Sequence, residues 1–168
     1  VLDQLDEQLL GSYVFFWGQK QERTPTWFGL LTERGEETEA VDVMHNIWNG
    51  SWPDNRAPQV RRIRLAGKDA SSNIRLKQGE RVKARLAVVD PDGDPLTFRW
   101  ELKPESTATQ VGGDYETSIG NLEGLIEDGD SWTARVTAPE PGAYRLFVYA
   151  YDDHGHAAHA NIPFLVTE

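Results

Sequence analysis

In three stretches of the chain, residues 82–88, 96–102 and 144–150, every second residue is apolar. This period of two is the period of a β-strand, which turns successive side chains to opposite faces of its sheet. Turn-forming sequences such as Asp-Gly-Asp, Gly-Gly and Pro-Gly separate these stretches at intervals of about ten residues. The pattern predicts a mainly β fold, with an antiparallel β-sandwich of about seven strands over residues 60–168.

The first 52 residues have a different texture, because they hold eight of the 17 aromatic residues. Residues 12–17 form a nearly continuous apolar run, which is typical of a strand buried on both faces. Residues 36–48 place apolar side chains at helical spacing, and Gly50 is suited to end that helix. This part is therefore predicted to be a strand, a loop and a helix.

Two prolines in the polar stretch 51–58 mark a boundary between these parts, since neither can continue a helix. The predicted organisation is an N-terminal part over residues 1–52, a linker over residues 53–59 and the β-sandwich over residues 60–168.

The charge of the chain limits its partners. The formal net charge is −10 and the isoelectric point is near 4.8, and both oppose binding to nucleic acid or to an anionic membrane. Residues 61–110 carry a formal charge of +4, but their cations alternate with apolar residues and form no block. We therefore expect neither a nucleic-acid nor a membrane partner. The absence of cysteine excludes disulfides and thiolate chemistry.

The C-terminal part resembles a known class of module. Its sequences VDPDGDPLTFRWEL and VTAPEPGAYRLFVYAYDDHGHAAHANIPFLV are similar to the polycystic-kidney-disease-type (PKD-type) and cadherin-like Ig folds appended to secreted bacterial polysaccharide-degrading enzymes. The resemblance implies an Ig-like β-sandwich. In such a sandwich Trp100 would pack in the core, and the hydroxyl of Tyr144 would bond a nearby backbone group.

The N-terminal sequence GSYVFFWGQKQERTPTWFGLLTERGEETEAVDVM resembles the last strand, loop and helix of a (β/α)8 glycoside hydrolase of the large retaining clan. The resemblance implies that Trp17 would form the floor of a sugar site. The acid and nucleophile carboxylates of such an enzyme would lie upstream of Val1, so no catalytic residue is expected in this chain. The implied context is a secreted, periplasmic or cell-surface protein of a bacterium, with the rest of a glycoside hydrolase chain as partner.

Three carboxylates, Asp90, Asp92 and Asp94, crowd one turn, and the topology of a sandwich can bring Asp152 to the same end. Oxygen ligands at this density suit Ca²⁺, so these four residues are candidate calcium ligands. An EF-hand is excluded because Pro95 stands where its loop needs glycine. The alternative is a solvated acidic turn that binds no cofactor.

The three histidines at 154, 156 and 159 are interpreted as exposed turn residues, since no third convergent ligand is evident for a metal. No phosphate-binding loop, nucleophile elbow or zinc-protease motif is present.

Phe147, Tyr149 and Tyr151 share the parity that faces away from the core of the sandwich. An outward aromatic row is either a platform for stacking sugars or a surface for docking another segment. We expect residues 36–52 to cover it. The competing prediction is a glycan platform, extended by Trp132 or Trp52.

Together these observations predict a non-catalytic accessory region of a secreted glycoside hydrolase, a spacer or stabilising module that holds calcium. The alternative is a carbohydrate-binding module that uses Trp17, Phe147, Tyr149 and Tyr151. A third hypothesis is a domain for calcium-dependent adhesion.

Overall fold

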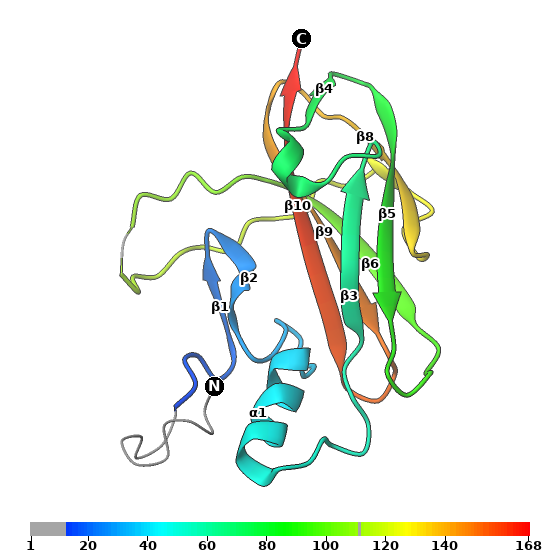
Figure 1. Cartoon of the computed structure of the whole chain (residues 1–168). Helices are drawn as coiled ribbons and strands as arrows, with labels where there is room; N and C mark the ends of the chain where they lie inside the picture. Colours follow the sequence, from blue (N-terminus) through cyan, green and yellow to red (C-terminus); the bar gives the residue numbers. More distant parts are fainter. Residues whose placement is uncertain (1–12, 111) are drawn as a thin grey trace.

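The computed structural model describes residues 13–110 and 112–168 and is mainly β, with one α-helix (Figure 1). The elements in chain order are β1 (Gln19–Glu22), β2 (Thr24–Gly29), α1 (Glu39–Asn49), β3 (Gln59–Leu65), the short 3-10 helix η2 (Ala70–Ser72), β4 (Arg75–Lys77), β5 (Arg81–Val89), β6 (Thr97–Pro104), β7 (Ile126–Glu127), β8 (Thr133–Thr137), β9 (Gly142–Tyr151) and β10 (Ala157–Thr167). Within residues 13–110 and 112–168, no helix could span a membrane.

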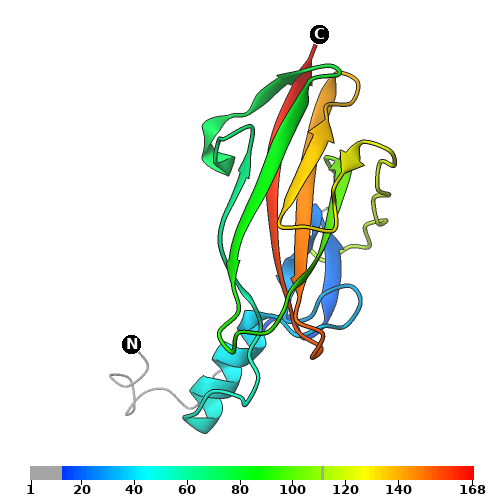
Figure 2. The same ribbon diagram turned by 90° about the vertical axis from the view of Figure 1, so that its right-hand side faces the viewer.

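Strands β3 to β10 form two four-stranded sheets, in the orders β4-β10-β9-β6 and β3-β5-β8-β7. Neighbouring strands are antiparallel except β4 and β10, which pair in parallel. The long strands of both sheets run along one axis (Figure 2). One hydrophobic core contains residues of both sheets, among them Leu86 and Val136 from one and Leu146 and Ile162 from the other.

The alternation in the sequence correctly predicts which side chains enter this core. On β5, Ala84 and Leu86 are buried, whereas Lys83 and Arg85 between and beside them are exposed. Burying the apolar set of each strand is favourable by about 25 cal/mol per Å² removed from water. Eight strands rather than about seven lie in the described part of residues 59–167.

The expectations for Trp100 and Tyr144 are confirmed. Trp100 is 5% exposed in the core, and its indole Nε1 donates a hydrogen bond of 2.8 Å to the carbonyl oxygen of Ser131. The hydroxyl of Tyr144 donates a bond of 2.9 Å to the carbonyl oxygen of Glu140.

The predicted strand over residues 12–17 is wrong for its described part, while Ser12 lies outside the described residues. Residues 13–18 form no strand, and Tyr13 and Trp17 are 100% and 62% exposed. A strand buried on both faces needs paired strands on each side. Instead the next residues form β1 and β2, which pair with each other as a two-stranded antiparallel hairpin.

The predicted helix over residues 36–48 is confirmed as α1, with a shift of boundaries. Its end is set by Gly50, which has a φ of 74° and donates its backbone N–H to Asn46. The apolar stripe of α1 is not fully buried, since Ile47 and Trp48 remain 41% and 51% exposed. The helix therefore does not cover the aromatic row of β9.

Candidate functional site

Three of the four predicted calcium ligands meet at one end of the two sheets. Asp90 and Asp94 belong to the turn after β5, and Asp152 follows β9 directly. One carboxylate oxygen from each lies within 4.8 Å of the others, so the group has the geometry to hold a metal ion. Asp92, the fourth predicted ligand, is outside this group of three.

Asp90 organises its own turn. Its Oδ1 accepts the backbone N–H groups of Asp92 at 2.9 Å and Asp94 at 3.0 Å. Its Oδ2 is buried and accepts no hydrogen bond from the residues that the structure describes. A buried carboxylate oxygen without a partner is costly, so the turn presents an oxygen that a cation would satisfy.

Asp152 is 1% exposed, and both of its oxygens have partners. Oδ1 accepts the backbone N–H groups of His154 at 2.8 Å and His156 at 3.1 Å, and Oδ2 lies 2.8 Å from Nδ1 of His156. Burial works to raise the pKa of Asp152, but these bonds to His154 and His156 outweigh it and hold the pKa below its usual value. Asp152 is therefore an anion at neutral pH.

Two linker residues, Asn55 and Arg56, also contact this cluster, and neither is among the predicted ligands. The side-chain amide of Asn55 donates a 2.6 Å bond to Oδ2 of Asp94, while its own Oδ1 is buried and unpartnered. The backbone N–H of Arg56 donates a 2.8 Å bond to Oδ2 of Asp92. Asp92 thus ties the linker to the turn. The polar composition of residues 53–59 was the one available signal, and it did not single out Asn55.

The three histidines have different surroundings. His154 is exposed, as predicted, whereas His156 bonds Asp152 and is only partly exposed. His159 points away from the core from β10, with its ring centroid 6.4 Å from that of Tyr149. Burial lowers the pKa of His159. The prediction of exposed turn histidines is therefore wrong for His156 and His159.

The aromatic row on β9 faces away from the core, as predicted, but it is not an open platform. Phe147 and Tyr149 are 2% and 4% exposed, and Tyr151 is half-buried. Burial is the main cause that raises the pKa of the Tyr149 hydroxyl. The prediction that Phe147 and Tyr149 form an exposed sugar-binding surface is wrong.

Residues before α1 cover part of this row, and the guanidinium of Arg99 from β6 lies over Tyr149, 4.7 Å from its ring centroid. Asn161, which lies opposite Phe147, donates a 3.3 Å bond to Thr26 of β2. The guanidinium of Arg34 lies 5.2 Å from the ring centroid of Tyr151. The predicted cover, residues 36–52, is thus largely replaced by β2 and the loop that follows it.

Backbone pairing explains why this loop docks there. The N–H of Glu37 donates to Gly155 at 2.9 Å, and the N–H of Ala157 donates to Glu37 at 2.8 Å. These two bonds hold residue 37 beside the turn between β9 and β10, and α1 then starts beyond the end of that sheet (Figure 1).

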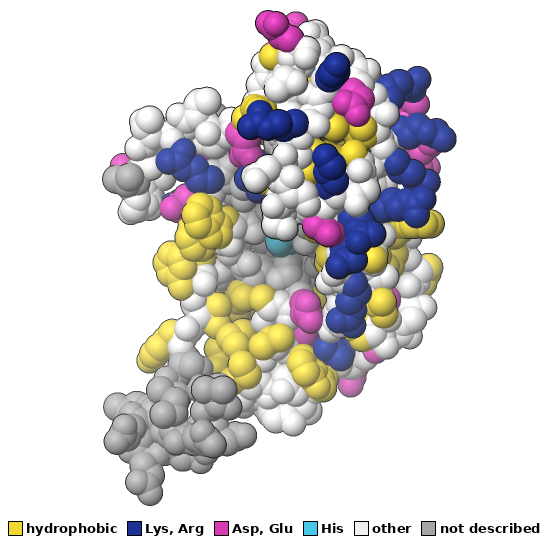
Figure 3. Space-filling view, turned by 45° about the horizontal axis from the view of Figure 1, so that its top comes forward, with side chains coloured by type: hydrophobic (Ala, Val, Ile, Leu, Met, Phe, Trp, Pro, Cys, Tyr) yellow, Lys and Arg dark blue, Asp and Glu magenta, His cyan; other side chains and the backbone are white. Residues whose placement is uncertain are grey.

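Exposed aromatic side chains gather on the hairpin side of the molecule. Trp27 is 63% exposed and stacks on Phe28, and Phe15 packs edge-on against the same Phe28 ring. Trp17 is also open to solvent. Figure 3 shows hydrophobic side chains on this side and a band of Lys and Arg on the opposite side.

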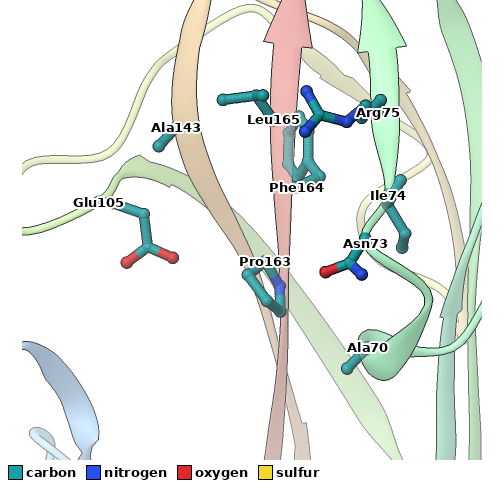
Figure 4. Close-up of a pocket in the computed structure, with 9 residues that line it drawn as sticks. All are labelled: Ala70, Asn73, Ile74, Arg75, Glu105, Ala143, Pro163, Phe164 and Leu165. Atoms are coloured by element: carbon teal, nitrogen blue, oxygen red, sulfur yellow. The ribbon is translucent and has the colours of Figure 1, made fainter.

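A cavity of about 210 Å³ lies between η2, β4 and β10 (Figure 4). Arg75 and Glu105 stand at its opposite sides, with Pro163 and Phe164 between them. Glu105 is already paired with Arg145 at 2.7 Å. Glu105 is the one carboxylate among the residues that line the cavity. The cavity therefore does not present the carboxylate pair that glycoside hydrolysis uses.

No family model matches the chain, and no curated protein matches it. Among solved structures, the chain is similar to a nucleoside hydrolase-related hypothetical protein from Saccharophagus degradans that is associated with carbohydrate metabolism. The two are 19% identical with a TM-score of 0.43, and the match covers 67% of this chain and 26% of that chain. The chain thus spans about a quarter of that protein's length.

Proposed function

We propose that this chain is a non-catalytic accessory region of a secreted bacterial glycoside hydrolase, in which a PKD-like and cadherin-like Ig-type β-sandwich holds calcium next to the linker. The observation that carries the proposal is the group of Asp90, Asp94 and Asp152, together with Asn55 from the linker. The two four-stranded sheets and the bond from Tyr144 to Glu140 support the Ig-type assignment. The domain boundaries at residues 52 and 60 stay a prediction.

The chemistry of the donor set suits calcium. Carboxylate and amide oxygens are hard ligands, and Ca²⁺ takes six to eight oxygens in flexible geometry. Among the described residues, the buried Oδ2 of Asp90 has no hydrogen-bond partner. A cation held by Asp90, Asp94 and Asp152 would give this oxygen a partner and would neutralise part of the cluster's charge.

Calcium at this position would join the linker to the sandwich. Asn55 and Arg56 already bond the acidic turn, and Ala57 bonds Asp42 of α1. A cation would strengthen a connection that runs from α1 through residues 55–57 to the turns of the two sheets. The proposed role is to orient the segment that precedes the sandwich.

The test is the melting temperature of the full chain with and without millimolar Ca²⁺. A ligand that binds only the folded state raises it by mass action, so calcium should raise it and Mg²⁺ should raise it less. Asp90→Asn with Asp94→Asn should abolish the rise. Asp128→Asn with Asp130→Asn, which removes two carboxylates from another turn, should preserve it. No rise in the parent chain, or a rise that survives the first double variant, contradicts the proposal.

The exposed aromatic residues support a second candidate, carbohydrate binding. Trp17 and Trp27 are each more than half exposed, and aromatic rings stack on sugar faces. They are equally suited to contact the rest of a glycoside hydrolase chain. Retardation of the chain in gels with neutral β-glucans, lost in Trp17→Ala with Trp27→Ala, supports the sugar site. Unchanged mobility of the parent chain contradicts it.

A further inference from the structure

The outer face of the sheet β3-β5-β8-β7 carries a concentration of cations. Strand pairing puts Arg64 opposite Arg85 and Lys83 opposite Arg135, and directly paired residues share a face. Six exposed cations project from this face, namely Arg62, Arg64, Arg81, Lys83, Arg85 and Arg135. They form the basic face, the band of Lys and Arg visible in Figure 3.

The placement of these cations on paired strands destabilises the sheet. Like charges placed directly opposite each other in a sheet repel, and two such pairs lie side by side here, Arg64 with Arg85 and Lys83 with Arg135. A sheet face that only had to be soluble could place acidic residues opposite basic ones on neighbouring strands and would avoid this repulsion. The charge is also opposite to that of the whole chain, which is −10.

Acidic residues compensate only the margins of the basic face. Asp69 lies 3.4 Å from Arg62 and 3.3 Å from Arg64, and Asp128 lies 2.7 Å from Arg135. Glu127 pairs with Arg81. Within the described residues, neither Lys83 nor Arg85 has an ion pair. These two stand about 7 Å apart on the central strand β5, so the uncompensated charge runs along the middle of the face.

The uncharged side chains of the basic face limit the classes of partner that it can bind. No aromatic residue occupies an outward position on these four strands, and Thr133 and Thr137 lie beside the cations. Protein interfaces need an apolar or aromatic centre, and single-stranded nucleic acids bind by stacking on aromatic rings. An amphipathic surface that enters a membrane also needs apolar side chains. Ala87 and Val89, the exposed apolar side chains at outward positions of β5, lie toward the end of that strand, beyond Lys83 and Arg85. The middle of the basic face therefore offers none of these centres.

A charged sugar chain is a polyanion that can bind a basic surface without such a centre. Arginine binds carboxylate or sulfate groups through two parallel hydrogen bonds, and threonine hydroxyls can exchange hydrogen bonds with sugar hydroxyls. A flat face with charges repeated along β5 fits an extended polymer whose units carry regular negative charge. We propose that the basic face binds an anionic polysaccharide, with Lys83 and Arg85 as the central contacts. This site is separate from the acidic cluster and does not rest on the proposed function.

The test is affinity electrophoresis of the full chain in gels with polygalacturonate, dextran sulfate or neutral dextran. Polygalacturonate and dextran sulfate separate carboxylate from sulfate recognition, and at least one should retard the chain at low salt while neutral dextran should not. Lys83→Ala with Arg85→Ala should weaken that binding by at least about tenfold, because each lost charge-assisted contact contributes more than a neutral one. Arg75→Ala with Lys77→Ala is the matched control, since it removes the same two residue types at the same spacing from β4 of the other sheet. This control should bind as the parent does.

The proposal is overturned if neither anionic polymer retards the chain, or if both double variants lose binding equally. It is also overturned if single-stranded DNA or phosphatidylserine vesicles bind more tightly than both polymers at equal charge, since the partner would then be a nucleic acid or a lipid surface. All four substituted residues are exposed, so both variants are expected to fold, and their melting curves provide the check.

Discussion

The carboxylate of Asp42, in the first turn of α1, accepts a 2.9 Å hydrogen bond from the backbone N–H of Ala57 in the linker. Asp42 is 1% exposed and Ala57 is fully buried. The pair fixes the helix to the chain segment that enters the two sheets. Burial raises the pKa of Asp42, although the bond from Ala57 works to lower it.

This relationship predicts a pH effect. The folded protein binds a proton at Asp42 more tightly than the unfolded chain, whose carboxyl has a pKa near 3.8. Stability contributed by the protonated Asp42 is therefore lost as the pH rises from 3.8 through the raised folded pKa. Denaturant melts at several pH values across this range should show that the free energy of unfolding of the parent chain falls relative to that of Asp42→Asn as the pH rises. Glu39→Gln, an exposed change on the same helix, should show no such decline, and a flat difference for Asp42→Asn would contradict the assignment.

Trp100→Ala should lower the free energy of unfolding by about 3–5 kcal/mol, because it leaves a cavity in the core and removes the bond to Ser131. Trp132→Ala is the control, since Trp132 is 51% exposed. Urea melts measure both. A loss below about 1 kcal/mol for Trp100→Ala would mean that the core relaxes around the site.

Gly29→Ala should disrupt the β1–β2 hairpin and uncover Phe147 and Tyr149. A Cβ at Gly29 would collide with the carbonyl oxygen of Gly18, and the backbone at Gly29 has a φ of 111°. Gly35→Ala is the matched control, because Gly35 also has a positive φ but has open space around its Cβ position. The first variant should bind a hydrophobic dye strongly and the second weakly. Equal dye binding would show that the hairpin is not the cover.

Arg85→Glu should stabilise the protein at low salt by about 0.2–1 kcal/mol, because it converts a repulsive pair with Arg64 into an attractive one. The gain should shrink as salt rises to ~1 M, where exposed charges are screened. Chemical denaturation with urea, which adds no ionic strength, measures the difference. Destabilisation at low salt would show that repulsion across this pair is negligible.

Part of the candidate site follows from the sequence. Asp90 and Asp152 each stand just beyond an alternating run, so a sandwich brings both to one end whatever the details of packing. Asn55 could not be identified in the same way, because its contact with Asp94 joins residues 39 positions apart without any repeating pattern. Contacts of this kind depend on where the linker crosses the sheet ends.

The basic face was missed for a related reason. Cations that alternate with apolar residues are dispersed along the sequence, so residues 61–110 show no basic block. On paired strands the same alternation sends Arg64, Lys83 and Arg85 to one side of a sheet. The same alternation that separates the cations along the chain therefore brings them together on one face of the sheet.

The sequence by itself determined β5, β6 and β9 and their inward faces, because the period of two and the burial of apolar side chains act residue by residue. Only the tertiary structure decided what lies over Phe147 and Tyr149. The apolar run at residues 12–17 and the stripe on α1 both had the composition to be buried, yet backbone bonds at Glu37 and the contact of Thr26 with Asn161 placed β2 and its following loop there. Which of several suitable segments docks depends on their competing long-range contacts, and no local pattern encodes the outcome.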